Sequence, residues 1–192
     1  MTLQVIDVNR VAAVPWRNGG GLTRELLAWP DATNWHCRIS VADISADGAF
    51  SSFPGIDRWF AVLEGDGVVL HFATHREALD CRSPPLHFDG AATPQCSLQG
   101  GATRDLNLML RRGTGNGVMQ RVHGDAEWFS IAPMRAVLTL EPARLQINDA
   151  DAAMLPAWSL ALSQHASRQR WRLQGDAAPN ALWLAFEPRA MP

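Results

Sequence analysis

The feature that most constrains the fold of this chain is a period-two alternation of apolar and polar residues over short segments. Trp35–Ile44 (WHCRISVADI) and Asp105–Arg112 (DLNLMLRR) both alternate in this way, which places every second side chain on the same face of a β-strand. No long segment has a 3.6-residue apolar period with capping residues at both ends, although Ala153–Ser167 is ambiguous. The pattern predicts an all-β chain of many short strands, as in a barrel or sandwich.

Turn residues divide the other apolar segments into further strands. Glu64–Gly67 separates the two apolar halves of Arg58–Phe72, which predicts a hairpin. The prolines and glycines of Thr74–Arg104 predict a long loop or lid with no more than one short strand. Strands are also expected in five segments of the second half: Gly117–Gly124, Glu127–Pro133, Arg135–Asn148, Arg168–Gly175 and Ala181–Pro188.

The glycine run Gly19–Gly21 allows two interpretations, a phosphate-binding loop or a chain reversal. A P-loop needs Lys and then Ser or Thr after its last glycine, and a dinucleotide-binding motif needs spaced glycines between a strand and a helix. Neither pattern is present. The pair Asn18-Gly19 favours a tight turn, and Leu22–Trp29 can alternate as the following strand. We therefore expect a hairpin or bulge in which glycine lets the backbone approach another segment.

Charge and composition argue against several classes of partner. The 192 residues carry a formal net charge of −2, so a basic surface that neutralises nucleic-acid phosphates is not expected. No apolar run approaches the roughly 20 residues of a membrane span, and the first residues do not resemble a signal peptide. We therefore expect a cytoplasmic protein without a membrane partner. The three cysteines, Cys37, Cys81 and Cys96, form no C-x-x-C pair, which fits a reducing compartment.

Four segments of the first half together carry a resemblance to a known family. They are PWRNGGGLTRE from Pro15, WHCRISVADIS from Trp35, DGAFSSFPGIDRWFAVLEGDGVVL from Asp47 and DLNLMLRRG from Asp105. In this order they resemble the HutD/Ves family of cupin-like proteins over residues 14–113, and the resemblance is weak beyond residue 115. It implies a bicupin, with an RmlC-like jelly-roll β-barrel in residues 1–113 and a second, smaller β half in residues 114–192.

For function, the resemblance implies a bacterial cytoplasmic protein with no settled enzyme activity. The HutD branch is linked to histidine utilisation, where the family is associated with binding a pathway metabolite and restraining pathway activity. The Ves branch is similar in sequence and is associated with stress response. The residues do not distinguish the two branches.

Cupin enzymes commonly hold a metal with a G-x5-H-x-H pattern that a glutamate follows, and this chain matches only the start of it. Gly65 is followed at the right distance by His71, but the second histidine position is Ala73. His75 lies about 13 Å from His71 along a strand, so the two converge only if the strand ends or bends. The cysteines and His87 lack the paired spacing of a zinc site, and no G-x-S-x-G motif is present. Neither a metal nor another cofactor is expected.

Polar side chains share one face on each of three predicted strands. They are Thr23 and Glu25, Arg38 and Ser40, and Asp105 and Asn107. Periodicity alone favours faces that meet water, as on one side of many antiparallel sheets; the alternative is a barrel lumen, a common ligand site. The resemblance favours the lumen, because the matching motifs contain these positions. Arg58, Phe53 and Met109 join the candidate ligand-binding residues, since Arg58 enters an apolar strand and must reach water or a carboxylate.

These residue types indicate a ligand with both an acid and a nitrogen function. The planar forks of Arg38 and Arg58 suit a carboxylate, whereas Asp105 or Glu25 can accept a hydrogen bond from an N–H group. The hydroxyl and amide side chains would orient the remainder, and the apolar members would cover an apolar part. Urocanate and the N-formyl or N-formimino derivatives of glutamate fit this description, as do many other amino-acid derivatives.

Three functions remain open on these grounds. The leading one is a metal-free protein that binds a small metabolite and thereby modulates histidine utilisation. The second is a cupin-type enzyme in which Glu25 or Asp105 acts as general base, although the sequence shows neither a shifted pKa nor a positioned partner for that role. The third is a stress-related scaffold that acts through a protein partner at an exposed apolar patch. A homo-oligomer formed through a sheet edge is compatible with all three.

Overall fold

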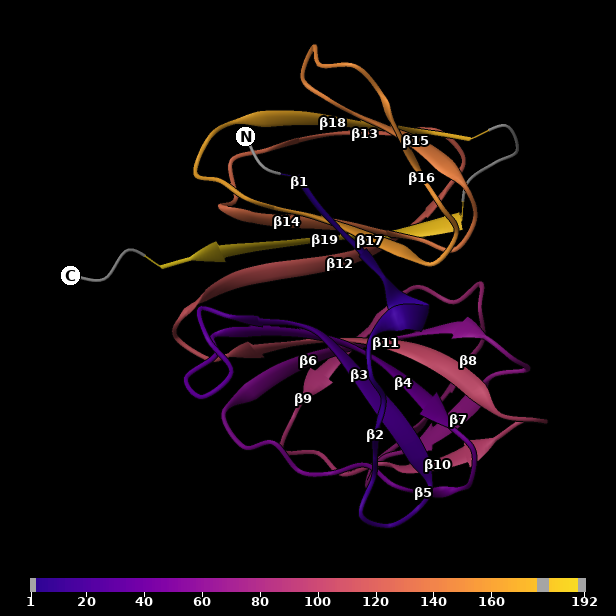
Figure 1. The fold of residues 1–192 in the computed structure, drawn as a ribbon. Coiled ribbons are helices and arrows are strands. Elements are labelled where there is room, and N and C mark those ends of the chain that lie inside the picture. The colour runs from indigo at the N-terminus through magenta and orange to yellow at the C-terminus, as the bar shows by residue number, and fades with distance from the viewer. Residues whose placement is uncertain (1–2, 176–179, 190–192) are drawn as a thin grey trace. The chain divides into compact units, whose positions relative to one another are not determined.

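The computed structural model describes residues 3–175 and 180–189, most of which lie in β-strands (Figure 1). This confirms the all-β prediction. The helix content of these residues is a single 3-10 turn, η1 (Val8–Arg10), and no helix among them is long and apolar enough to cross a membrane. The chain forms two compact units: the N-terminal unit, Val11–Thr114, and the C-terminal unit, which combines Met1–Arg10 with Gly115–Pro192.

The first ten residues thus belong to the C-terminal unit, whereas the sequence placed all of residues 1–113 in the first domain. The reason is strand pairing. β1 (Leu3–Asp7) pairs antiparallel with β17 (Ser159–Gln164) along its whole length, and the amide of Val8 donates to the carbonyl of Trp158. Local alternation indicates that a strand exists, but not which sheet edge it joins.

The N-terminal unit is a jelly roll of eight strands, β4 to β11, in two sheets. One sheet has the order β4-β11-β6-β9 and the other β5-β10-β7-β8, so that the first strand lies beside the eighth and the second beside the seventh. Two further strands, β2 and β3, extend the first sheet beyond β4. The strands are β2 (Val14–Pro15), β3 (Gly21–Trp29), β4 (Cys37–Ile44), β5 (Gly48–Ala49), β6 (Ile56–Glu64), β7 (Val68–His71), β8 (Arg76–Leu79), β9 (Leu86–Asp89), β10 (Gln95–Leu98) and β11 (Thr103–Arg111).

The C-terminal unit repeats this arrangement with strands β12 to β19. Its sheets have the orders β12-β19-β14-β17 and β13-β18-β15-β16, and β1 extends the first sheet beyond β17. The jelly roll therefore occurs twice, which confirms the cupin-like bicupin prediction. The ambiguous segment Ala153–Ser167 contains two of these strands. The strands not yet given are β12 (Gly115–His123), β13 (Ala126–Ser130), β14 (Met134–Thr139), β15 (Ala143–Ile147), β16 (Ala153–Leu155), β18 (Gln169–Gln174) and β19 (Asn180–Pro188).

Two local predictions were wrong. Residues 74–104, expected to be a loop or lid, hold the strands β8, β9 and β10. Pro85 and Pro94 stand directly before β9 and β10, a position at which a strand tolerates proline. β6 and β7, expected to form a hairpin, belong to different sheets. Gly65 and Gly67, with φ of +98° and +104°, turn the chain from one sheet to the other.

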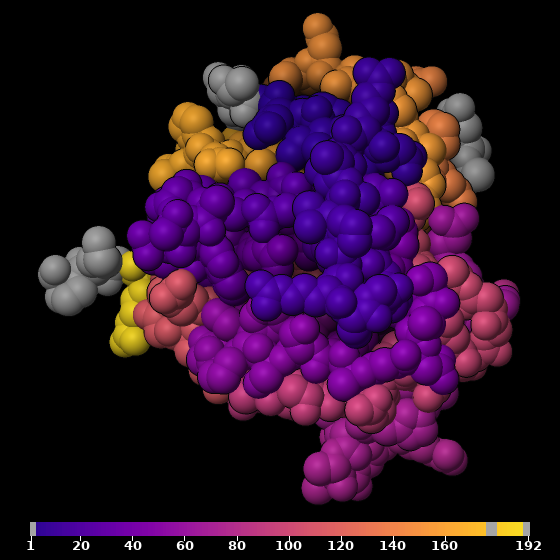
Figure 2. Space-filling view, turned by 60° about the horizontal axis from the view of Figure 1, so that its bottom comes forward, coloured from indigo at the N-terminus to yellow at the C-terminus, as the bar shows by residue number. Residues whose placement is uncertain are grey.

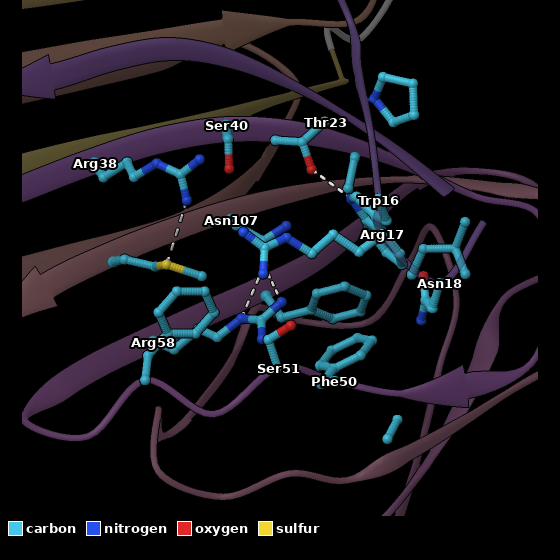
Figure 3. Close-up of a pocket in the computed structure, with 17 residues that line it drawn as sticks. Trp16, Arg17, Asn18, Thr23, Arg38, Ser40, Phe50, Ser51, Arg58 and Asn107 are labelled. Atoms are coloured by element: carbon cyan, nitrogen blue, oxygen red, sulfur yellow. Dashed lines mark hydrogen bonds between the residues drawn. The ribbon is translucent and has the colours of Figure 1, made fainter. Parts of the chain in front are cut away.

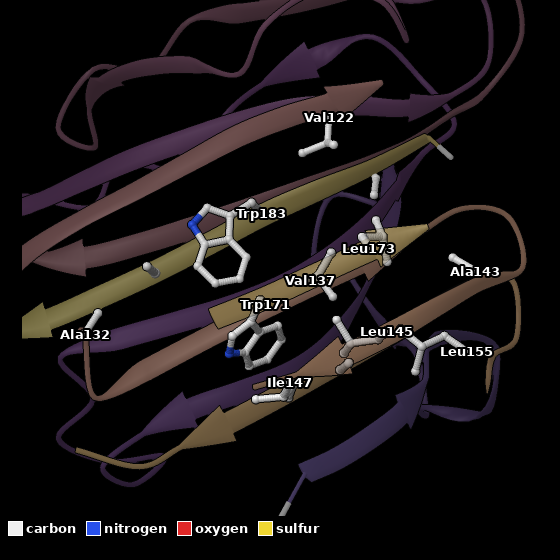
Figure 4. Close-up of a cluster of buried hydrophobic side chains, with 13 residues drawn as sticks. Val122, Ala132, Val137, Ala143, Leu145, Ile147, Leu155, Trp171, Leu173 and Trp183 are labelled. Atoms are coloured by element: carbon white, nitrogen blue, oxygen red, sulfur yellow. The ribbon is translucent and has the colours of Figure 1, made fainter. Parts of the chain in front are cut away.

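The two jelly rolls differ in what fills them. The interior of the C-terminal unit is packed with aliphatic side chains around Trp171 and Trp183, whose rings meet edge to face with centroids 5.3 Å apart (Figure 4). In the N-terminal unit, a hydrophobic cluster that includes Ile44, Phe50 and Phe60 fills part of the interior. These three residues also border a polar pocket.

Candidate functional site

The pocket lies within the N-terminal unit and has a volume of about 420 Å³. Its walls come from β3, β4, β6 and β11, from the loop between β2 and β3, and from the segment that follows β5 (Figure 3). On the face shown in Figure 2, the indigo and violet surface of this unit is hollowed. The pocket is therefore a cavity on one side of the jelly-roll interior and is large enough for a small molecule.

Strand register brings the polar residues of the pocket together. β11 lies between β4 and β6, and Met109 is directly opposite Arg38 on one side and Arg58 on the other. One step of the alternation away, Asn107 is opposite Ser40 on β4. Directly opposed residues share a face of an antiparallel sheet, so two rows of side chains point into the same cavity. The period-two pattern of the sequence is the cause of this convergence.

Arg58 is the most firmly held cation of the pocket, with 7% of its surface exposed. Its Nε and Nη2 both donate to Asn107 Oδ1, at 2.9 and 2.6 Å, and its guanidinium lies 4.4 Å from the centroid of the Phe50 ring. Burial lowers the pKa of Arg58 to about 9, and the nearby carboxyl of Asp105 acts in the opposite direction. Nη1 makes no hydrogen bond to any described residue, so this edge of the fork is available to a ligand.

Arg38 forms an ion pair with Glu25 on the neighbouring strand. Its Nε donates to Glu25 Oε2 at 2.6 Å, and its Nη1 contacts the sulfur of Met109 at 4.0 Å. Glu25 is on β3, the neighbour of β4, opposite Ser40. This ion pair offsets the charge of Arg38, because the two groups are only partly exposed and in direct contact.

A hairpin loop between β2 and β3 forms one side of the pocket. Asn18-Gly19 makes the predicted turn, with Gly19 at φ +72° and its amide donating to the Trp16 carbonyl. Trp16 Nε1 donates to Thr23 Oγ1 at 2.7 Å, which fixes the indole as part of the wall. Arg17 extends from the loop into the pocket (Figure 3) and forms no ion pair with the described residues.

The close approach expected of the glycine run is also confirmed. At Gly21, a Cβ would collide with the carbonyl oxygen of Asp43 and press against the ring of Trp16. Only glycine leaves room for this contact between neighbouring strands. The run therefore positions the loop, and Asn18 uses its side chain to accept a hydrogen bond from the amide of Gly20 at 3.1 Å.

Seven of the nine candidate residues line the pocket. They are Thr23, Arg38, Ser40, Phe53, Arg58, Asn107 and Met109. Ser40 and Asn107 are each 3% exposed, so this face does not meet bulk water as periodicity alone suggested. Glu25 lies beside the pocket and reaches it only through Arg38.

Asp105 is the candidate that the structure places elsewhere. Its side chain is fully buried, accepts a hydrogen bond from Thr103 Oγ1 at 2.9 Å, and has no partner for Oδ1 in the described residues. Burial raises the pKa of Asp105 to about 8 against the opposing effects of Thr103 and Arg58. Asp105 is two residues before Asn107 on β11 and lies outside the pocket lining. With this pKa, its carboxyl is largely protonated at neutral pH. It is therefore not placed to accept a hydrogen bond from a ligand or to act as a base there.

Sequence reasoning missed several residues of the pocket. Arg17, Asn18, Phe50 and Ser51 line it without having been assigned to it. The turn signal at Asn18-Gly19 located the loop, but alternation carries no information about side chains in loops. The cation–π contact of Arg58 with Phe50 needed the tertiary structure, because Phe50 follows β5 and Arg58 lies in β6, a strand of the other sheet.

The structure holds no group of three or more His, Cys, Asp or Glu side chains that could bind a metal within residues 3–175 and 180–189. His71 is exposed at the end of β7. His75 stacks on Phe72 with ring centroids 4.7 Å apart. Cys37, Cys81 and Cys96 are free thiols.

Comparison with known proteins identifies relatives along most of the chain. The sequence profile of the HutD family matches residues 8–181. Protein Ves of Citrobacter koseri is 37% identical over 112 residues, which are 57% of this chain and 59% of that protein. An uncharacterised 21.2 kDa protein from the region 3′ of hutC in Pseudomonas putida is 34% identical over 131 residues, 66% of this chain and 64% of that protein. The alignments thus span about three fifths of the length of these relatives.

Solved structures agree over nearly the whole chain. HutD from Pseudomonas fluorescens SBW25 has a TM-score of 0.87 at 25% identity, covering 98% of this chain and 100% of that one. A conserved protein of unknown function from Pseudomonas aeruginosa PAO1 has a TM-score of 0.89 at 25% identity, covering 97% and 100%. A cupin 2 conserved barrel domain protein from Leptotrichia buccalis shares the fold, with a TM-score of 0.61 at 9% identity and 96% of each chain covered. The chain therefore belongs to the HutD family of cupin-like proteins.

Proposed function

We propose that the pocket of the N-terminal unit binds a small molecule with a carboxylate and a nitrogen function, of the urocanate or N-formyl or N-formimino glutamate class. One observation carries this proposal: three arginines, Arg17, Arg38 and Arg58, enter one cavity, and among the described residues only Arg38 has a carboxylate partner. Two of these charges are left to attract an anion. A cavity of about 420 Å³ is within the ordinary range of small-molecule sites.

The free donors of the pocket suggest how such a ligand is held. Arg58 can offer Nη1 to an anion while Nε and Nη2 each donate to Asn107 Oδ1, so the guanidinium does not have to be ordered when the ligand binds. The Arg17 guanidinium supplies a second contact. The hydroxyl of Ser40 has no partner in the described residues and can accept from or donate to the nitrogen function. Phe50 and Phe53 cover the apolar part.

The pocket supports binding better than acid–base catalysis. Its lining, drawn from the described residues, contains no carboxylate, histidine or cysteine. A general base must reach the proton it removes, within about 3 Å or through one water. Glu25 is committed to Arg38, and Asp105 lies outside the lining.

The proposal extends to a biological role. The names of two relatives connect them to histidine utilisation, one by its place in the region 3′ of hutC in Pseudomonas putida and one as HutD of Pseudomonas fluorescens. We infer that this chain binds a metabolite of that pathway in the cytoplasm and modulates histidine utilisation by doing so. The free cysteines fit a reducing compartment.

Calorimetric titration with urocanate, N-formyl-glutamate and N-formimino-glutamate tests the proposal. Each charge-assisted hydrogen bond contributes about 1.5–3 kcal/mol, so Arg17→Ala and Arg58→Ala should each weaken binding by about ten- to a hundredfold. Arg24→Ala is the matched control, because Arg24 is a partly buried arginine of β3 that pairs with Asp43 outside the pocket. Unchanged affinity in both pocket variants would exclude this site. Conversion of a titrated compound to product, followed by chromatography, would favour the enzyme instead.

A further inference from the structure

The longest strand edge of the C-terminal unit is open. β12 (Gly115–His123) is the last strand of its sheet and pairs with β19 at nine consecutive positions without a register shift. No strand among the described residues pairs with its other side. An open edge presents unpaired backbone amides and carbonyls that readily pair with another strand.

The corresponding edge of the N-terminal unit is covered. β4 holds the place in its jelly roll that β12 holds in the second, the first strand of eight. β3 pairs along β4 from Gly21 opposite Ile44 to Trp29 opposite Cys37. The same fold thus adds a strand at this edge in one unit and none in the other.

β12 also lacks the features that usually protect an open edge. It contains no proline, and its register with β19 has no bulge. Of the nine residues of β12, Arg121 is the one with a formal charge, and it lies near one end of the strand. Val118, near the middle, is 42% exposed. The strand is therefore long, regular and weakly charged, which favours pairing over solvation.

Exposed apolar side chains gather beside this edge. Val118, Phe129 and Ile131 are 42%, 61% and 63% exposed, and they line one groove of about 550 Å³ between β12 and β13, the edge strand of the other sheet. They are three of the six large exposed hydrophobic residues among those described. Trp128 and Trp183 stack in the same groove, with ring centroids 4.7 Å apart. Such a patch is typical of an interaction surface.

We propose that β12 is a dimer interface at which a second copy of this chain pairs antiparallel about a two-fold axis near Met119. Met119 is the central residue of the strand, so this register pairs all nine residues and joins two five-stranded sheets into one of ten strands. Val118 then faces the partner's Gln120, and Arg121 faces the partner's Gly117. No like charges oppose each other, and the interface is self-complementary as a two-fold axis requires.

Sedimentation velocity over a range of concentrations tests the proposal. Val118→Lys buries a charge at the interface and should raise the dimer dissociation constant by about tenfold or more. Val5→Lys is the matched control, because Val5 is 47% exposed on β1, at the opposite edge of the same sheet, and this variant should dimerise like the wild type. A wild type that stays monomeric overturns the proposal. So does a dimer that Val118→Lys leaves intact.

Cross-linking tests the register separately. Cys37 and Cys96 are buried, so Cys81→Ser provides a background without an accessible thiol. In that background, Val118→Cys combined with Gln120→Cys places the thiol at position 118 of one copy opposite the thiol at position 120 of the other. Their Cβ atoms would be about 4.5–5.5 Å apart. Mild oxidation should therefore give a disulfide-linked dimer. Val118→Cys alone should not, because position 118 meets its own copy only diagonally. Equal cross-linking of both variants, or of neither, contradicts this register.

Discussion

The buried carboxyl of Asp105 should make the stability of the protein fall as the pH rises. Its pKa in the folded state is raised to about 8 by burial, whereas an unfolded aspartate has a pKa of about 3.9. Between these values the unfolded chain releases the proton and the folded chain keeps it, so the contribution of this group is fully present below pH 4 and is lost as the pH rises to 8. Each pH unit is worth about 1.4 kcal/mol, and the loss between pH 5 and pH 8 is about 4 kcal/mol.

The substitution Asp105→Asn removes this titration and keeps the size of the side chain and an acceptor for Thr103 Oγ1. Urea denaturation of both proteins at pH 5, 6, 7 and 8 measures the effect. The difference in unfolding free energy between variant and wild type should grow in favour of the variant across this range. An amide left without a partner in place of Oδ1 costs the same free energy at every pH and leaves the slope unchanged. Parallel pH profiles for the two proteins would refute the reasoning.

Two further predictions concern the pocket wall and the turn between the sheets. Glu25→Gln keeps an acceptor for Arg38 Nε but removes the negative charge that offsets the charge of Arg38. Calorimetric titration should therefore find carboxylate ligands bound about three- to tenfold more tightly. Weaker binding would mean that Glu25 itself holds the ligand. Gly67 has φ +104°, and Gly67→Ala adds a Cβ that collides with the carbonyl oxygen of Leu79. Thermal denaturation should therefore show a loss of about 1–3 kcal/mol in the free energy of unfolding. An unchanged melting temperature would contradict the assigned backbone conformation.

The polar lining of the pocket was predictable because it follows from strand alternation. Arg38 and Ser40 are two residues apart on β4, and Asn107 and Met109 are two apart on β11, so the pattern alone places each pair on one face. What the pattern leaves undecided is whether that face meets water or a lumen. The family resemblance resolved this point, and the 3% exposure of Ser40 and Asn107 agrees with it.

Two kinds of feature were not predictable from alternation: which positions along a strand line the pocket, and which distant segments pair. Asp105 shares a face with Asn107 two residues away on β11, yet it lies outside the pocket lining and is fully buried. The position of β1 in the C-terminal unit depends on a partner strand more than 150 residues away in sequence. Arg17 reaches the pocket from a loop, where no periodicity applies. Each of these features is a property of tertiary packing.

The central claim is that arginines in the pocket of the N-terminal unit bind the carboxylate of a small metabolite. Its most direct test is to compare, by calorimetry, the binding of a carboxylate ligand with that of its neutral amide, for example urocanate against the amide of urocanate. Loss of the charge removes the contacts to Arg58 and Arg17, so the amide should bind at least about tenfold more weakly. Equal affinity of the acid and the amide, or no binding of any acid of this class, would contradict the account.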